Sequence, residues 1–284
     1  MVDNFSVRVG DRVFKTGLRE PDTVNTGYAS YPPTDTLELA EIKHLYGRPG
    51  RKMATDMYKR RKQQGPVSSC CAYAVTNANE VKRRFDRKTD VEFGAEHMYC
   101  RINGGRDDGA QLKHGMDDSL RNGCCLRGSV PEHIWSFQGN MSMEQRRFAD
   151  QEAQDYKALD WNQLPFGEVE AAWAAAVSAV ALRNPALIAV HCGPNFFSCG
   201  LDGVFRPDRG RGNHAVCAVD LLGVATARSL RDLKLVVINS HGKRYGHDGC
   251  YLHTIDHMAG PSTVHVQSVC RAMKTSPDEN EVLN

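Results

Sequence analysis

Cys70 stands where a helix is expected to begin, and such a position favours thiol chemistry. Gly65-Pro66 forms a turn, and Ser68-Ser69 supplies two small hydroxyl residues suited to a helix start. The unpaired N–H groups and the positive end of the dipole in a first helical turn stabilise an anion. They therefore lower the pKa of a thiol there and make its thiolate more available. A buried structural cysteine is the alternative, and it is the commoner use of this residue type.

Three residues elsewhere in the chain have the types needed to complete a site around Cys70. A thiol nucleophile needs an imidazole that stabilises its thiolate and later protonates a leaving amine, and His214 stands at the entry of a predicted strand. The imidazole needs an acceptor that fixes its ring, and Asn239 follows another predicted strand. A tetrahedral oxyanion requires donors, which the Gln64 amide and the Cys70 N–H can supply. Together these residues predict nucleophilic acyl chemistry.

The elements that must position these residues are mainly helical in the first half of the chain and mainly strands in the second. Apolar residues spaced three and four apart after Ser69 predict a buried amphipathic helix over 69–85. The other expected helices are 36–46, 93–100, a segment from 112 that stops at 122–123, and 169–183. The expected strands are a hairpin over 5–9 and 12–14, then 186–190, 215–224, 233–238, 249–254 and 264–269. This order predicts an α+β fold, with a helical lobe over about 61–165, a β lobe over about 166–284 and a cleft between them.

The order of these motifs resembles that of the papain-like cysteine peptidases (peptidase family C1), in a divergent bacterial or viral type. Gln64 and Cys70 keep the spacing between the glutamine and the nucleophile of that family, so Cys70 and not Cys71 aligns with the nucleophile. His214 is followed by Ala-Val, and Asn239 by Ser, as in the family. The resemblance extends from about Gln64 to Tyr251, with every motif in family order.

The resemblance implies a two-lobed cysteine-type endopeptidase that hydrolyses peptide bonds through a thioester acyl-enzyme. It implies Cys70, His214 and Asn239 as the catalytic residues and Gln64 as an oxyanion donor. Ser68, Gly109 and Asn213 would bind the backbone of a peptide or protein substrate. No cofactor and no metal is implied.

Several positions depart from the family pattern. Cys71 and His241 stand where the family has Trp, and the second of those Trp residues shields the Asn–His hydrogen bond from water. Ser68 replaces a Gly beside the cleft, and Val67 replaces a disulfide-forming Cys. Two alternatives therefore stay open: a papain-like scaffold with little or no protease activity that serves a structural or binding role, for example in a virion, and an acyl transferase that uses the same triad.

Residues 1–60 form an extension with little core of its own. It lacks the long helical signature of the family's inhibitory propeptides, so we expect an autoinhibitory role of another kind or a partner-binding role, which would include assembly into a larger complex. The basic residues that precede Gln64 are interpreted as a solvated face, because no aromatic or motif context accompanies them.

The composition excludes several classes of protein. Of 284 residues, 41% are hydrophobic and 25% charged, with a net charge of +2, which predicts neither a nucleic-acid nor a membrane partner. No apolar run reaches the length of a membrane span, and the start lacks the apolar core of a secretory signal, so a cytoplasmic or virion-associated location is expected. The ten cysteines show no zinc-type spacing, since His191-Cys192 with Cys199 does not fit it. Disulfides from Cys192 to Cys199, or from Cys100 to Cys124-Cys125, are left open. The remaining histidines are interpreted as surface or core residues: His44, His97, His114, His133, His247, His253, His257 and His265.

Overall fold

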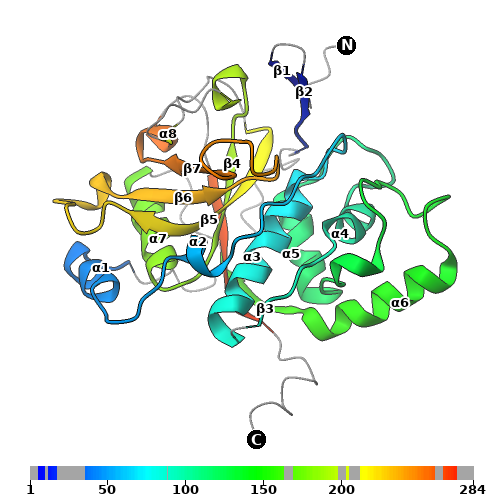
Figure 1. Ribbon diagram of the computed structural model, residues 1–284, viewed down its shortest axis with the longest axis horizontal. Helices are drawn as coiled ribbons and strands as arrows, with labels where there is room; N and C mark the ends of the chain where they lie inside the picture. Colours follow the sequence, from blue (N-terminus) through cyan, green and yellow to red (C-terminus); the bar gives the residue numbers. More distant parts are fainter. Residues whose placement is uncertain are drawn as a thin grey trace, which may run out of the picture.

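A computed structural model describes residues 6–9, 12–17, 36–87, 89–162, 169–197, 203–204, 212–259 and 265–273. Helices α4, α5 and α6 gather on one side of the molecule, and the six-stranded sheet lies on the other together with α1, α7 and α8; α3 lies between the two sides (Figure 1). The helices are α1 Leu39–Tyr46, α2 Ala54–Met57, α3 Cys70–Arg87, α4 Ala95–Ile102, α5 Leu112–Arg121, α6 Met143–Ala153, α7 Val169–Ala181 and α8 Asp256–Ala259. The strands are β1 Ser6–Val9, β2 Arg12–Lys15, β3 Ala158–Asn162, β4 Ala186–Val190, β5 His214–Leu222, β6 Lys234–Ile238, β7 Cys250–His253 and β8 His265–Met273. Short 3₁₀ turns are η1 Arg127–Ser129, η2 Gln154–Tyr156, η3 Pro194–Phe197 and η4 Leu230–Asp232.

The six-stranded sheet is antiparallel, with the strand order β3-β8-β4-β5-β6-β7. Side chains alternate between its two faces, so each central strand contributes to two cores. On β5, Ala215 and Cys217 join the core around α3, whereas Val216 and Ala218 join the core around α7. Because helices cover both faces of the sheet at β5, nearly all residues of this strand are apolar. The sheet thereby fixes His214, its first residue, next to the helical side of the molecule.

The central helix α3 forms where the apolar spacing predicts it. The prediction started this helix at Ser69, and the structure starts it one residue later, at Cys70. Its buried face includes Cys71, Ala74, Ala78 and Val81, which pack in the core shared by α4, α5 and β5. Cys70 is consequently held at the N-terminus of the most buried helix of the helical side.

Most predicted elements are present with shifts of one to four residues at their ends. The apolar run at 186–190 corresponds to β4 without change, and the run at 264–269 extends to Met273 in β8. The prediction missed α2, α6 and β3. Helix α2 has only four residues, and α6 and β3 contain polar residues that interrupt the apolar pattern. β3 lies in the sheet although it precedes residue 166, and α1 packs beside α7. The loop expected over 17–35 lies outside the described residues except for Gly17.

A buried ionic group ties the stretch before α3 to that helix. The ammonium of Lys62 contacts the carboxylate of Glu80 on α3 and donates to the Phe93 carbonyl at 3.0 Å. Glu80 also accepts from the Phe93 N–H at 2.6 Å and from the Tyr58 hydroxyl at 2.5 Å. Buried charges are tolerated when they are paired and hydrogen-bonded in this way. The network fixes the course of residues 58–62 and hence the position of Gln64 two residues later.

Asp220 anchors the segment around α1 and α2 to the sheet. Its buried carboxylate accepts from the Tyr46 hydroxyl at 2.6 Å, from the Leu221 N–H at 2.9 Å and from the Ala54 N–H. We expect Asp220→Ala to lower the free energy of unfolding by about 3 kcal/mol, because several buried donors lose their acceptor. Tyr46→Phe, which removes one hydroxyl, should cost about 1 kcal/mol. Urea unfolding of both variants measures the difference, and equal losses would contradict this role for Asp220.

The structure describes all the cysteines of one of the two disulfides left open by the sequence, the bridge from Cys100 to Cys124 or Cys125. Cys100, Cys124 and Cys125 carry free thiols, so the bridge from Cys100 to the Cys124-Cys125 pair is absent, and that possibility is wrong. Burial raises the pKa of Cys100 and of Cys124 to about 12. These thiols are therefore inert core groups near neutral pH. The alternative pairing with Cys199 ends on a residue outside the described residues.

Candidate active site

His214 and Asn239 form a buried hydrogen-bonded pair. His214 opens β5, and Asn239 follows the last residue of β6, the neighbouring strand. The His214 Nε2 lies 2.8 Å from the Asn239 Oδ1, and neither residue has exposed surface. An amide oxygen accepts only, so this contact assigns the ring proton of that pair to Nε2. The other ring nitrogen, Nδ1, is left to face a different partner.

Cys70 interacts electrostatically with His214, and its thiol is perturbed strongly. Burial by itself raises the pKa of Cys70, but hydrogen bonds from Cys71, His214 and the Ala215 backbone and the charge of His214 act against burial. The net result is that the pKa of Cys70 lies well below its ordinary value. A thiol with a lowered pKa stays ionised to lower pH than other cysteines do. The structure thus brings together Cys70, His214 and Asn239, the three residues selected from the sequence.

Gln64 lies beside this group, and its side chain is held by several contacts. Its Nε2 donates to the Val67 carbonyl at 2.8 Å, and its Oε1 accepts from the Ser240 hydroxyl at 2.6 Å. Ser240 also donates its N–H to the Asn239 Oδ1 at 2.7 Å. Ser240 therefore links Asn239 to Gln64 through its own backbone and side chain. Sequence reasoning did not assign this role, although the Asn-Ser pair was noted.

Residues Lys15–Gly17, called here the cleft segment, lie against the same group. The Gln64 Nε2 donates to the Lys15 carbonyl at 3.1 Å, the Gly17 N–H donates to the Asn213 carbonyl at 3.1 Å, and the Ala110 N–H donates to the Gly17 carbonyl at 2.7 Å. Thr16 has no exposed surface. The segment continues from the β1–β2 hairpin, which lies at the top of Figure 1 near the junction of the two sides. An extended stretch of the chain's own backbone thus occupies the predicted substrate site.

The cleft segment fits because Gly17 has no side chain. A methyl group on Gly17 would lie 1.9 Å from the Ser68 carbonyl oxygen, a distance that no carbon atom tolerates. A methyl group on Gly109 would lie 2.2 Å from the Gly17 carbonyl oxygen, and Gly109 has φ of +88°. Both walls of the cleft therefore approach the backbone of the segment closely. The predicted substrate-binding residues Ser68, Gly109 and Asn213 all contact it.

One detail of the predicted substrate contacts differs in the structure. The N–H of Gly109 donates to the Tyr99 hydroxyl at 3.1 Å, so it is the next residue, Ala110, whose N–H reaches the cleft segment. Tyr99 in turn donates to Asp107 at 2.9 Å, and Asp107 accepts from the Ser68 N–H at 2.8 Å. Asp107 stands in the polar loop over 103–109, yet its carboxylate joins the two walls of the cleft. Its position in a Gly-rich polar loop gave no signal of this.

Cys71 replaces a large aromatic residue of the family pattern with a small thiol. Its Sγ lies 2.8 Å from the Ala110 carbonyl and 3.7 Å from the Gly17 carbonyl. The first contact ties the start of α3 to the Ala110 wall of the cleft. Cys71 therefore acts in packing the site, while Cys70 carries the perturbed thiol.

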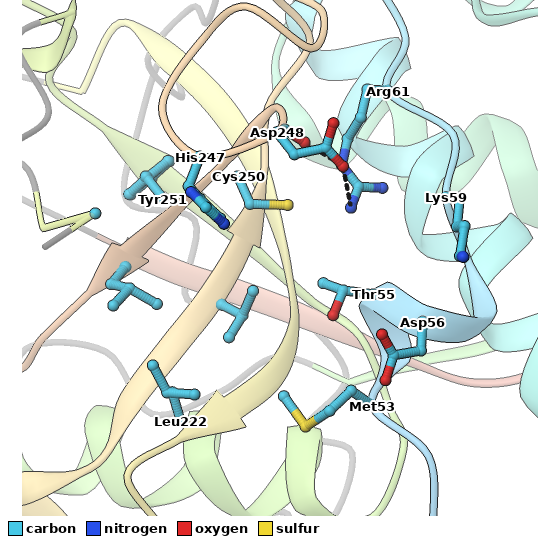
Figure 2. Close-up of a pocket in the computed structure, with 13 residues that line it drawn as sticks. Met53, Thr55, Asp56, Lys59, Arg61, Leu222, His247, Asp248, Cys250 and Tyr251 are labelled. Carbon is cyan, nitrogen blue, oxygen red and sulfur yellow. Dashed lines mark hydrogen bonds and ion pairs between the residues drawn. The ribbon is translucent and has the colours of Figure 1, made fainter. Parts of the chain in front are cut away.

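A separate hollow of about 590 Å³ lies between α2 and the β6–β7 edge (Figure 2). Figure 2 shows Lys59 and Arg61 on one wall and Asp248, joined to Arg61, on the rim above Cys250. None of the residues that line it is a predicted site residue.

The described residues also bear on metals and membranes. Within the described part of the chain, no three His, Cys, Asp or Glu side chains gather as a metal site would require. No helix there combines the length and apolar character of a membrane span.

Comparisons with known proteins identify the fold. No protein-family model matches the sequence, and no curated protein does either. Among solved structures, xylellain, a cysteine protease from Xylella fastidiosa, aligns over 92% of this chain and 96% of its own, with a TM-score of 0.62 and 18% identity. Digestive procathepsin L 3 of Tenebrio molitor aligns over 84% and 73%, with a TM-score of 0.57 and 14% identity. The bromelain protease of Ananas comosus aligns over 84% and 98%, with a TM-score of 0.55 and 16% identity.

All of these neighbours are papain-like cysteine proteases. The chain therefore has the papain-like α+β fold, as the sequence predicts. At these identities the similarity shows the fold, and what the chain does must be argued from its own residues.

Proposed function

We propose that this papain-like chain is a cysteine peptidase that hydrolyses peptide bonds through an acyl-enzyme on Cys70. The observation that carries the proposal is the buried group in which the lowered-pKa thiol of Cys70 faces His214, which is hydrogen-bonded to Asn239 at 2.8 Å. A structural cysteine in a core needs no such neighbours, because burial alone raises the pKa of its thiol and keeps it protonated.

The mechanism follows from the roles of these groups. The Cys70 thiolate attacks the carbonyl carbon, and the Gln64 amide and the Cys70 N–H stabilise the oxyanion. The imidazolium of His214 gives its proton to the amine as the C–N bond breaks, which leaves a thioester on Cys70. His214 then takes a proton from water as the water attacks the thioester, and the acid and the thiolate are released. Asn239 orients the ring of His214 throughout.

Hydrolysis of an N-blocked dipeptidyl fluorogenic amide tests the proposal. The wild-type chain and the Gly17→Ala chain, in which the cleft segment is displaced, should release the fluorophore, and His214→Ala on either background should not. If the Gly17→Ala chain releases no more than its His214→Ala counterpart, the peptidase proposal fails and a scaffold role is favoured. Formation of an amide with an added amine, in place of the free acid, would instead favour the acyl-transferase alternative.

Gln64→Ala is expected to lower kcat by about 10²- to 10³-fold, since the loss of one oxyanion donor has an effect of that size. The neighbouring residue gives a matched control, because the side chain of Gln63 is exposed. Gln63→Ala should leave kcat within about twofold of the wild type. Steady-state kinetics on the same amide substrate measure both, and equal effects of the two variants would contradict the assignment of Gln64.

We further propose that the N-terminal extension inhibits the peptidase through the cleft segment. Its three hydrogen bonds join it to Gln64, the proposed oxyanion donor, to Asn213, a proposed substrate-binding residue, and to Ala110, the neighbour of Gly109. A substrate must displace the segment before it can bind, so the apparent affinity falls with the fraction of open molecules. The consequence for Gly17 is developed in the Discussion.

A further inference from the structure

His241 occupies a position in the site that its residue type alone does not explain. It follows Asn239-Ser240 at the end of β6, and its backbone is held by an isolated antiparallel bridge to Gln63. Flanking hydrogen bonds fix this bridge: the Gln64 N–H donates to the Ser240 carbonyl at 2.8 Å and the Gly242 N–H to the Lys62 carbonyl at 3.0 Å. The backbone that holds Gln64 therefore also sets the orientation of His241.

The ring of His241 stacks face to face on the ring of His214. Their centroids are 4.9 Å apart, and the ring planes differ by 8°. The Phe196 ring packs edge-on against the His214 ring, with centroids 5.5 Å apart. The rings of His241, His214 and Phe196 therefore form one group. A flat ring over the His214–Asn239 hydrogen bond limits the access of water to it, and its π face can support a cationic imidazole.

Among the described residues, aromatic rings from several elements pack against the His241 ring. β5 contributes His214, η3 contributes Phe197 at 5.4 Å, and the loop after β6 contributes Tyr245 at 6.1 Å. Phe197 carries no charge, and the Tyr245 hydroxyl donates to the Phe196 carbonyl. His214 is thus the neighbour among these three whose charge acts on His241.

We propose that His241 is a positioning residue, whose ring covers His214 by stacking and keeps His214 hydrogen-bonded to Asn239 and in place beside the thiol of Cys70. The inference rests on the proposed function, since it concerns the thiolate–imidazolium pair of that site. Although His241 stands where the resemblance places a Trp, the stack preserves a flat cover over His214.

The electrostatics agree with a neutral cover. The surrounding protein and the charge of His214 lower the pKa of His241 well below its ordinary value. His241 therefore stays uncharged to a pH well below that at which a free histidine is protonated, and only there would its own charge repel a cationic His214. A ring that cannot ionise, such as Phe, should therefore keep the cover and remove this acid-side repulsion.

The test compares His241→Leu, which retains apolar volume without a π face, with His241→Phe, which retains a ring. The ultraviolet absorbance of the Cys70 thiolate, taken as the difference between each chain and its Cys70→Ala counterpart, is followed against pH. In His241→Leu the pH at which the thiolate is lost should rise by about one unit, because a tenfold weaker interaction with His214 raises the pKa of Cys70 by that amount. His241→Phe should restore the wild-type value or lie below it. On the amide substrate, His241→Leu should lower kcat about tenfold with KM unchanged.

A second stacked histidine pair supplies the matched control. The His257 ring on α8 stacks on His253 of β7 with centroids 4.6 Å apart, away from the three site residues. His257→Leu should leave the thiolate titration unchanged. The proposal is overturned if His241→Leu titrates as the wild type does, if His241→Phe fails to restore it, or if His257→Leu shifts it equally. Because the titration needs no turnover, a chain that hydrolyses no peptide still tests the role of His241.

Discussion

Cys70→Ala should abolish peptide hydrolysis, lowering kcat by about 10⁴-fold or more, whereas Cys71→Ala should lower it by less than about tenfold. The two residues are adjacent and both buried, yet they differ in their surroundings. The thiol of Cys70 interacts with His214 and has a lowered pKa, while that of Cys71 lies 2.8 Å from the Ala110 carbonyl. Removal of the first takes away the nucleophile, and removal of the second takes away one packing contact.

Steady-state kinetics on the blocked dipeptidyl amide, with thermal unfolding as a check on folding, measure this contrast. The two variants have the same change in side-chain volume, so each serves as the control for the other. A larger loss in Cys71→Ala would move the nucleophile to the second cysteine and would break the register that pairs Gln64 with Cys70.

Gly17→Ala should raise kcat/KM by at least about tenfold, because the substitution displaces the cleft segment and increases the fraction of open molecules. The added methyl group would lie 1.9 Å from the Ser68 carbonyl oxygen and 2.5 Å from its carbon, and both are backbone atoms that cannot turn aside. The segment must leave or shift, which breaks its contacts with Gln64, Asn213 and Ala110. The effect should appear mainly as a lower KM.

Gly128→Ala is the matched control, since a methyl group there meets nothing within 4 Å. It should leave kcat/KM unchanged. An unchanged or lower kcat/KM in Gly17→Ala, with thermal stability preserved, would contradict inhibition by the cleft segment. In that case the contacts of Lys15–Gly17 would have a structural role only.

The sequence predicts the parts of the site that depend on local pattern. The helix that starts at Cys70 follows from its apolar stripe, and the entry of His214 into β5 and the exit of Asn239 from β6 follow from apolar runs with turn residues between them. The resemblance to the papain-like family, in which a glutamine keeps this spacing from the nucleophile, then selects Cys70 of the two adjacent cysteines. These signals are local, and a single sequence contains them.

The contacts that the sequence does not predict join segments that are far apart in the chain. The carboxylate of Asp107 holds Ser68, the hydroxyl of Ser240 holds Gln64, and the Lys15 carbonyl meets Gln64 across 49 positions. Polar residues in loops give no periodic signal, so their partners appear only when the chain is folded. The cover that His241 forms over His214 belongs to the same class, because the sequence shows a histidine in place of a Trp but not the ring on which it stacks.

Labelling of the ten cysteines tests the central claim most directly. The Gly17→Ala chain is treated with limiting iodoacetamide at about pH 5, where a thiolate reacts and ordinary thiols stay protonated, and the site of the adduct is mapped by mass spectrometry. We expect a single adduct on Cys70, formed more slowly in the wild-type chain and lost in His214→Ala. An adduct spread over several cysteines, or none on Cys70 while others react, would contradict an activated nucleophile at this position.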